Sequence, residues 1–111
     1  MPRISTHVLD TSLGRPAAGV AIELFRGLIP VAVTGTNFDG RTDQPLLECE
    51  LIEPGGYDLI FHVGDYLRSA ANGREPFYET ISVSFIVKNG LENYHIPLLL
   101  SPYGYSTYRG S

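Results

Sequence analysis

The chain has 111 residues, a net charge of −4, 43% hydrophobic residues and 18% charged residues. This composition predicts one folded domain with a buried core, covering residues 1–111, and excludes a disordered chain. The 8 Lys and Arg residues are scattered and form no basic stripe, so we expect no nucleic acid as a partner.

The sequence also bears on location and redox state. The N-terminal residues lack the apolar stretch of a signal peptide, and no apolar run is long enough to span a bilayer. We therefore expect a cytoplasmic protein with no membrane partner. A single cysteine, Cys49, excludes an intramolecular disulfide, and its alternation with Leu47 and Leu51 predicts that it is buried in the core.

Short runs rich in Val, Ile, Leu, Phe and Tyr alternate with turns rich in Gly and Pro, which is typical of an all-β sandwich or barrel. We expect eight strands, at residues 4–10, 20–26, 31–36, 46–52, 57–63, 80–88, 93–100 and 105–109. One short helix is predicted to begin at Asp65, a favourable N-cap residue, and to continue through Ala71. Asn72 and Gly73 are expected to end it.

Strand periodicity separates buried from exposed positions. The odd positions of residues 57–63 are the more apolar set, and the β-branched and leucine residues of 20–25 share one face. The even positions of residues 93–100 form a strongly apolar face, so His95 is predicted to point away from the core.

Few residues indicate a catalytic function. The sequence has no G-x-S-x-G, Walker A, H-E-x-x-H or C-x-x-C motif. What remains is three strand histidines, His7, His62 and His95, and two cationic residues beside glycines, Arg41 and Arg109. Most titratable residues serve no chemistry, so from the residues alone a merely exposed or hydrogen-bonded histidine is favoured over a catalytic one.

Five motifs follow one another along the chain. They are HVLD at 7–10, GRPA at 14–17, DGRT at 39–42, YHIPLLLSP at 94–102 and YSTYRGS at 105–111. In this order they resemble the transthyretin-related 5-hydroxyisourate hydrolase family, and the closing YRGS is the most specific of them. The hormone carrier transthyretin shares the SPY and YST phrases but lacks the histidines, the loop arginine and the closing tetrapeptide.

The resemblance implies a transthyretin-like (prealbumin-like) two-sheet β-sandwich of two four-stranded sheets. One sheet, made of the first, fourth, seventh and eighth predicted strands, would line a channel through a homotetramer that is a dimer of dimers. His7, Arg41, His95 and the closing tetrapeptide would then converge on one surface. His62 would lie in the other sheet, as a bystander that faces solvent.

The resemblance also implies an activity, the hydrolysis of 5-hydroxyisourate to 2-oxo-4-hydroxy-4-carboxy-5-ureidoimidazoline in urate (purine) degradation, without a cofactor. The catalytic residues would be His7, Arg41, His95 and Ser111, and the substrate-binding residues His7, Arg41 and Tyr108. Histidine exchanges protons near neutral pH, and the arginine fork holds negative charge. Ser111 would orient a histidine or the water through its hydroxyl or the terminal carboxylate.

Several alternatives stay open. The sequence does not say which histidine is the base and which the acid. A transthyretin-like carrier without catalysis would need no proton-transfer groups, and a metal site would need the three histidines to meet with a carboxylate at ligand spacing. Arg109 lies on the opposite strand face from Tyr108, so an ion pair is at least as well supported as substrate contact, and Arg109 is left out of the catalytic set. Gly110 is expected to let the chain bend into the channel.

Overall fold

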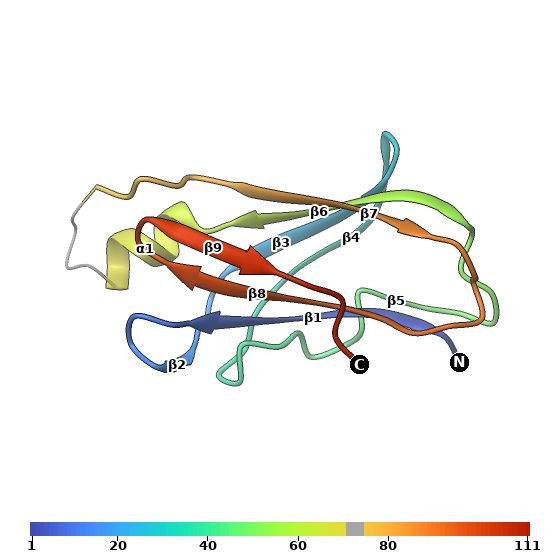
Figure 1. The fold of residues 1–111 in the computed structure, drawn as a ribbon, viewed down its shortest axis with the longest axis horizontal. Coiled ribbons are helices and arrows are strands. Elements are labelled where there is room, and N and C mark those ends of the chain that lie inside the picture. Colours follow the sequence, from blue (N-terminus) through green and yellow to red (C-terminus); the bar gives the residue numbers. More distant parts are fainter. Residues whose placement is uncertain (71–74) are drawn as a thin grey trace.

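The computed structural model describes residues 1–70 and 75–111 and has two β-sheets packed face to face, with one helix at one end (Figure 1). One sheet has the order β2-β1-β8-β9, with β5 also paired to β1, and is called the β1 sheet here. The other has the order β4-β3-β6-β7 and is called the β6 sheet. The elements are β1 Arg3–Asp10, β2 Arg15–Pro16, β3 Ala21–Arg26, β4 Ile29–Gly35, β5 Leu47–Glu48, β6 Gly55–His62, α1 Gly64–Ala70, β7 Ile81–Val87, β8 Tyr94–Ser101 and β9 Gly104–Thr107.

The predicted all-β sandwich is confirmed, with three corrections. The fourth predicted strand is reduced to the two residues of β5, and the last strand ends at Thr107 instead of Arg109. An additional short strand, β2, lies where only a turn was expected. The β1 sheet therefore has five strands instead of the expected four.

The outer edge of β1 explains the two short strands. Its C-terminal end pairs with β2 through Leu9 and Asp10, and its N-terminal end pairs with β5 through Arg3 and Ile4. The middle of the edge is covered by a loop, because the Val8 amide donates to the carbonyl of Gly40 at 2.8 Å. Hydrophobic periodicity does not reveal how one edge is divided among three partners.

The core forms between the two sheets from alternate residues of their strands. The odd positions of β6 are buried and the even positions are half-exposed, as predicted. On β8 the predicted apolar face is buried, and His95 is only half-buried on the other face. The fully buried side chains of largest volume are Tyr57, Phe61, Ile4, Ile22, Leu24, Ile52, Leu59, Ile81, Leu98, Leu100, Val8 and Val20. Burial of each aliphatic side chain of this size contributes about 1.5–3 kcal/mol.

The prediction that Cys49 is a core residue is wrong. Its side chain is half-buried, and the neighbouring Leu51 is 59% exposed. The chain leaves the sheet after Glu48, so the alternation of the following residues no longer corresponds to two faces of a strand.

The helix α1 begins at Gly64, one residue before the predicted N-cap. Its expected end, at Ala71, Asn72 and Gly73, lies outside the described residues. The Gly64 amide donates to the carbonyl of Glu79 at 3.0 Å, and a Cβ on Gly64 would overlap the Glu79 carboxylate. The glycine thus leaves room for the Glu79 side chain beside the start of α1. Within residues 1–70 and 75–111, no helix has the length and apolar character needed to cross a membrane.

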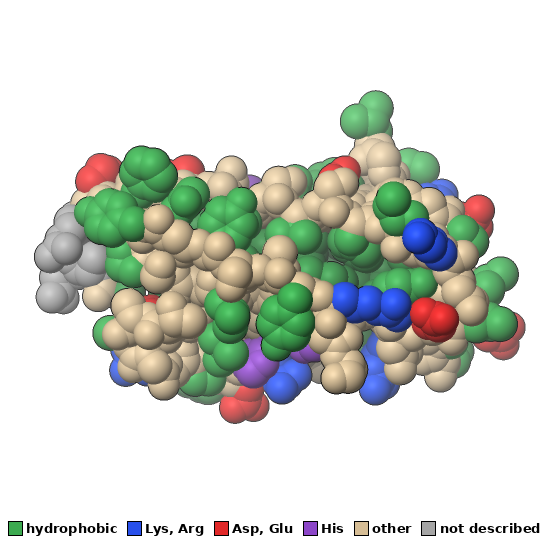
Figure 2. Space-filling model, viewed as in Figure 1, with side chains coloured by type: hydrophobic (Ala, Val, Ile, Leu, Met, Phe, Trp, Pro, Cys, Tyr) green, Lys and Arg blue, Asp and Glu red, His purple; other side chains and the backbone are tan. Residues whose placement is uncertain are grey.

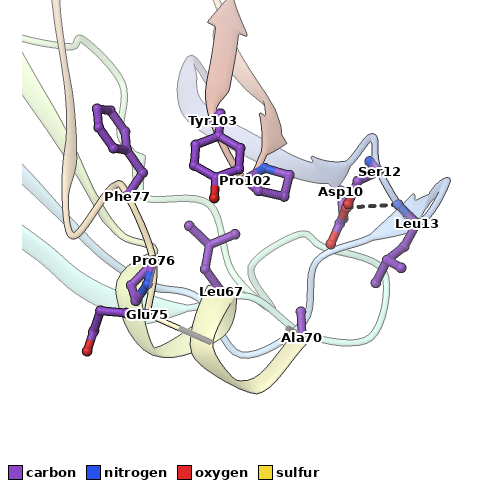
Figure 3. A pocket seen from close by; sticks show the side chains of 10 residues that line it. All are labelled: Asp10, Ser12, Leu13, Leu67, Ala70, Glu75, Pro76, Phe77, Pro102 and Tyr103. Carbon is purple, nitrogen blue, oxygen red and sulfur yellow. Dashed lines mark hydrogen bonds between the residues drawn. The ribbon is translucent and has the colours of Figure 1, made fainter. Parts of the chain in front are cut away.

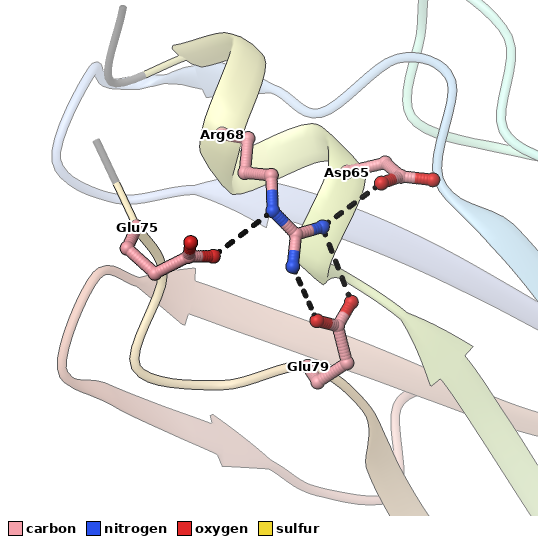
Figure 4. A network of polar contacts seen from close by, with 4 residues as sticks. All are labelled: Asp65, Arg68, Glu75 and Glu79. Atoms are coloured by element: carbon pink, nitrogen blue, oxygen red, sulfur yellow. Dashed lines mark hydrogen bonds and ion pairs between the residues drawn. The ribbon is translucent and has the colours of Figure 1, made fainter. Parts of the chain in front are cut away.

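One arginine joins α1 to the segment before β7 (Figure 4). The Arg68 guanidinium donates to Asp65 at 2.9 Å, to Glu75 at 3.1 Å and to Glu79 at 2.5 Å. The hydrogen bonds to Glu79 and then to Glu75 raise the pKa of Arg68 above its ordinary value. All four side chains are at the surface, so the network orients the helix more than it stabilises the fold.

Candidate active site

The outer face of the β1 sheet carries the histidines that the sequence singled out. Along β1 the even residues are buried, so Arg3, Ser5 and His7 share the outer face. Strands β1 and β8 run parallel, with Ser5 opposite His95 and His7 opposite Pro97. Figure 2 shows histidine side chains close together on this face, beside a Lys or Arg side chain.

Arg41 reaches the same face on the loop that covers the middle of β1. The loop is held by Asn37, whose side-chain oxygen accepts from the amides of Asp39 at 2.9 Å and Arg41 at 3.3 Å. The Asn37 amide donates to the Arg41 carbonyl at 2.7 Å, and its side chain donates to Asp43 at 2.9 Å. The backbone on both sides of Arg41 is therefore fixed without use of its guanidinium.

Gly40 allows the loop to lie against β1. Its φ of +73° is in the left-handed region, and a Cβ would overlap the carbonyl oxygen of Val8 and lie 3.3 Å from Cδ2 of His7. No other residue fits both requirements. Among the described residues the guanidinium of Arg41 forms no ion pair, which leaves its donors available to a ligand.

An open cleft of about 400 Å³ lies beside β1, β8 and the loop that carries Arg41. Its lining includes three of the predicted catalytic residues, Arg41, His95 and Ser111, together with Ser5. His7 does not line the cleft itself but lies next to Gly40 at its edge.

The two histidines and Arg41 are close enough to change each other's protonation. Burial, and after it the charge of Arg41, lower the pKa of His7 below 6.5, although the backbone and the charge of the nearby Asp39 oppose this. Burial, Arg41 and His7 together lower the pKa of His95. Both rings are therefore neutral at pH 7, and each has one ring nitrogen able to accept a proton.

The C-terminal residues pass over His95. The Gly110 amide donates to the His95 carbonyl at 2.7 Å, and a Cβ on Gly110 would lie 2.7 Å from Cδ2 of the His95 ring and 3.3 Å from Cγ of Pro97. Gly110 is not among the glycines with a positive φ. The requirement for glycine here is the close approach to the ring, not the bend that the sequence suggested.

Tyr108 and Arg109 lie outside the cleft. Tyr108 is 58% exposed and lines a neighbouring groove with Ile96 and Phe85. Arg109 donates to Glu92 at 3.1 Å, and its guanidinium carbon lies 4.4 Å from the centre of the Tyr94 ring. The ion pair of Arg109 is therefore present.

His62 lies on β6, in the other sheet, as expected. Its Nε2 lies 2.6 Å from a carboxylate oxygen of Glu23, and the histidine side chain is 42% exposed. The three histidines therefore do not meet. In the part of the chain that the structure describes, no cluster of three His, Cys, Asp or Glu residues is arranged to hold a metal ion.

Sequence reasoning missed two residues of this site. Ser5 shares a strand face with His7, which periodicity alone would show, but its contact with His95 depends on the register of β1 against β8. Asn37 begins a turn that was recognised in the sequence, yet nothing in the turn signal connects it to Arg41.

A second cavity lies at the end of the sandwich that carries α1 (Figure 3). It measures about 70 Å³ and is mainly apolar, with Leu67, Phe77 and Tyr103 among its lining residues. Its buried carboxylate, Asp10, already accepts from the amide and hydroxyl of Ser12, the Leu13 amide and the Tyr66 hydroxyl. Burial alone would raise the pKa of Asp10, but these hydrogen bonds lower it below its ordinary value. This carboxylate therefore serves the turn after β1.

Comparison with known proteins gives consistent matches over the whole chain. The model of the HIUase/Transthyretin family matches residues 4–110. The 5-hydroxyisourate hydrolase 2 of Rhizobium meliloti is 50% identical over 115 residues, which cover 98% of this chain and 96% of that protein.

Two solved structures are similar in fold. The 5-hydroxyisourate hydrolase of Klebsiella pneumoniae is 36% identical with a TM-score of 0.81, over 100% of both chains. An (S)-allantoin synthase is 37% identical with a TM-score of 0.87 over 99% of this chain. This chain spans only 44% of that synthase.

Proposed function

Since the chain belongs to the HIUase/Transthyretin family, we propose that it hydrolyses 5-hydroxyisourate to 2-oxo-4-hydroxy-4-carboxy-5-ureidoimidazoline in urate degradation. The observation that carries the proposal is the placement of His7, His95 and Arg41 on one face of the β1 sheet, where Arg41 has no ion-pair partner within the described residues. A carrier that only binds its ligand would need no such proton-transfer pair.

Opening a lactam ring with water requires three functions. A base takes a proton from water as its oxygen bonds to the carbonyl carbon, donors hold the resulting oxyanion, and an acid protonates the nitrogen when the C–N bond breaks. The geometry offers a group for each of these functions.

His7 is suited to the role of base. Its pKa is lowered below 6.5, so the ring is neutral near pH 7 and one ring nitrogen has a free lone pair. His95 lies near both Arg41 and His7 and is assigned to the acid step, in which the proton that His7 takes from water is passed on to the leaving nitrogen.

Arg41 is assigned to the oxyanion. Its guanidinium stays charged and presents several donors in one plane, which suits a planar substrate with carbonyl groups at its edge. The loop held by Asn37 and Gly40 fixes its position before substrate binds, and such preorganised donors contribute most to stabilising developing charge.

Two residues of the closing tetrapeptide complete the proposed site. Ser111 lines the cleft and is assigned to orienting the attacking water. Tyr108 lies beside the cleft with an exposed ring and is assigned to substrate binding. The assignment of Ser111 is supported by its place in the cleft with His95, and that of Tyr108 by its exposed ring two residues before Gly110, which pairs with His95.

We further propose that the protein acts as a homotetramer. Leu9 and Leu99 are direct neighbours in the β1–β8 register, and both are half-buried on the outer face of the sheet. An apolar pair beside a polar cleft favours a partner subunit over solvent. The cytoplasmic location stays a prediction, which cell fractionation would test.

An ultraviolet assay tests the activity directly. Decay of freshly generated 5-hydroxyisourate is followed with and without the protein, and we expect decay to be accelerated in proportion to protein concentration. Decay at the uncatalysed rate, together with saturable binding of the compound, would show that the protein is a carrier.

A further inference from the structure

We propose that Ser5 is a positioning residue of the site, whose hydroxyl holds the imidazole of His95 in one orientation. Its effect on rate rests on the proposed hydrolase function, whereas its effect on the ring does not. None of the sequence motifs includes this serine.

The contact follows from the sheet register. Ser5 and His95 are opposite each other in the parallel pairing of β1 and β8, and both side chains point to the outer face. The Ser5 Oγ lies 2.9 Å from Nδ1 of His95 in a partly buried hydrogen bond. Both residues line the cleft that also includes Arg41.

The hydrogen bond determines which ring nitrogen is free. A serine hydroxyl can donate to Nδ1 or accept from it, so the contact fixes the orientation of the ring and not its tautomer. With Nδ1 bound to Ser5, Nε2 is the nitrogen available to substrate. A flip of the ring would place a carbon against the hydroxyl and lose the hydrogen bond.

A second contact fixes the plane of the ring. The Cα of Gly110 passes so close to the ring that a Cβ there would lie 2.7 Å from Cδ2 of His95. The ring is thus held at Nδ1 by a polar group and at Cδ2 by backbone. Packing alone would fix the ring plane, but only Ser5 distinguishes a nitrogen from a carbon.

The test uses Ser5→Thr and Ser5→Val, which have nearly the same shape and differ in the hydroxyl. Both β-branched residues suit a strand, so the pair separates hydrogen bonding from folding. Ser5→Ala is added as the smallest change. Ser101→Ala is the matched control. It removes a hydrogen bond of the same length, 2.9 Å, which the Ser101 hydroxyl donates to the Gly104 carbonyl at the far end of β8.

We expect Ser5→Val and Ser5→Ala to lower kcat between about 10-fold and about 100-fold, as loss of an outer hydrogen-bonding partner does, with a smaller effect on KM. Ser5→Thr should keep most of the activity, and Ser101→Ala all of it. The ¹⁵N chemical shift of His95 Nδ1, measured without substrate, should be nearly the same in the wild type and in Ser5→Thr, and should change in Ser5→Val, where the hydrogen bond is lost.

The two readouts separate this proposal from the hydrolase function. A changed Nδ1 shift in Ser5→Val with no turnover by the wild type would support positioning and overturn the proposed reaction. An unchanged His95 spectrum in Ser5→Val overturns the positioning role, whatever happens to the rate. Equal loss of activity in Ser5→Thr and Ser5→Val would also overturn it, because the shape of the side chain would then be responsible.

Discussion

Arg41 acts on both histidines before any substrate is present. Its charge lowers the pKa of His7 and of His95, after burial has already lowered each. Burial and this one loop residue therefore both favour the neutral form of the two strand histidines. In the proposed mechanism the same charge would hold the oxyanion, so protonation and transition-state stabilisation would both depend on this side chain.

Replacing Arg41 by Gln should raise the pKa of both histidines, because a nearby positive charge disfavours the protonated ring. NMR titration of the ring protons would measure this, with Arg15→Gln, an equal charge change on β2, as the control. In the wild type, activity should fall as pH drops through these lowered values, below 6.5. Titration curves that do not move in Arg41→Gln would refute the coupling.

The folding stability should change with pH in the same direction as the activity. The folded pKa of each ring lies below its ordinary value of 6.5, so the unfolded chain binds more protons as pH falls below that value. The contribution of the two neutral rings to stability is present above pH 6.5 and is lost as the solution becomes more acidic.

The three histidines provide an internal comparison. We expect His7→Asn and His95→Asn each to lower the rate of ring opening at least about 100-fold, the usual contribution of a positioned acid or base. His62→Asn should leave the rate nearly unchanged, because its partner is Glu23 in the other sheet. Steady-state kinetics on the three variants would decide, and three similar rates would contradict the assignment.

At the scale of elements, the divided edge of β1 creates the site. Strands β2 and β5 each cover only two residues of this edge, and the loop with Gly40 fills the space between them. A longer β5 would displace the loop and with it Arg41. The brevity of these strands is therefore a condition for the arrangement of the site.

Two glycines in the same conformation allow a controlled test of this loop. Gly40→Ala combines an unfavourable φ of +73° with overlap at Val8, whereas Gly14→Ala has a φ of +68° and no atom within 4 Å. We expect Gly14→Ala to cost about 1 kcal/mol without loss of activity. Gly40→Ala should cost at least about 2 kcal/mol and also lower kcat, as Arg41 moves.

Chemical denaturation and kinetics on both variants would check this expectation. Equal stability and equal kcat for Gly40→Ala and Gly14→Ala would show that the close approach to β1 is unimportant.

The sequence predicts strands well where hydrophobic and polar residues alternate clearly. It predicts them poorly where pairing with a neighbouring strand determines whether a strand forms. The buried faces of β6 and β8 follow from period 2, so Tyr57 and His95 were placed on the correct sides. Two-residue strands such as β2 have no period to detect. The contact of Ser5 with His95 depends on a register between strands far apart in the chain, and no local pattern encodes it.

At the scale of the whole molecule, the outer face of the β1 sheet carries an apolar pair that a partner subunit would cover. Leu9 and Leu99 lie side by side there, next to the residues assigned to catalysis. In a tetramer this face would be covered by a second subunit, which would exclude water from the cleft and strengthen the electrostatic interactions within it.

Leu99→Asp should therefore dissociate the tetramer and lower activity while the fold is retained, because Leu99 is outside the buried core. Light scattering at micromolar concentration, with circular dichroism, would measure this. Leu28→Asp is the control, since Leu28 is 97% exposed in a turn between β3 and β4. A wild-type monomer with full activity would contradict the proposed assembly.

The parallel pairing of β1 with β8 also orders events during biosynthesis. The ribosome makes β1 first, but its central partner in the sheet, β8, is made among the last elements of the chain. Ser5 and His95 are 90 positions apart, so closing this pair requires nearly the whole polypeptide. Such non-local pairing slows folding, because chain entropy is lost before the contact compensates for it. A nascent chain thus holds no assembled site, and catalysis begins only after synthesis of β8 is complete.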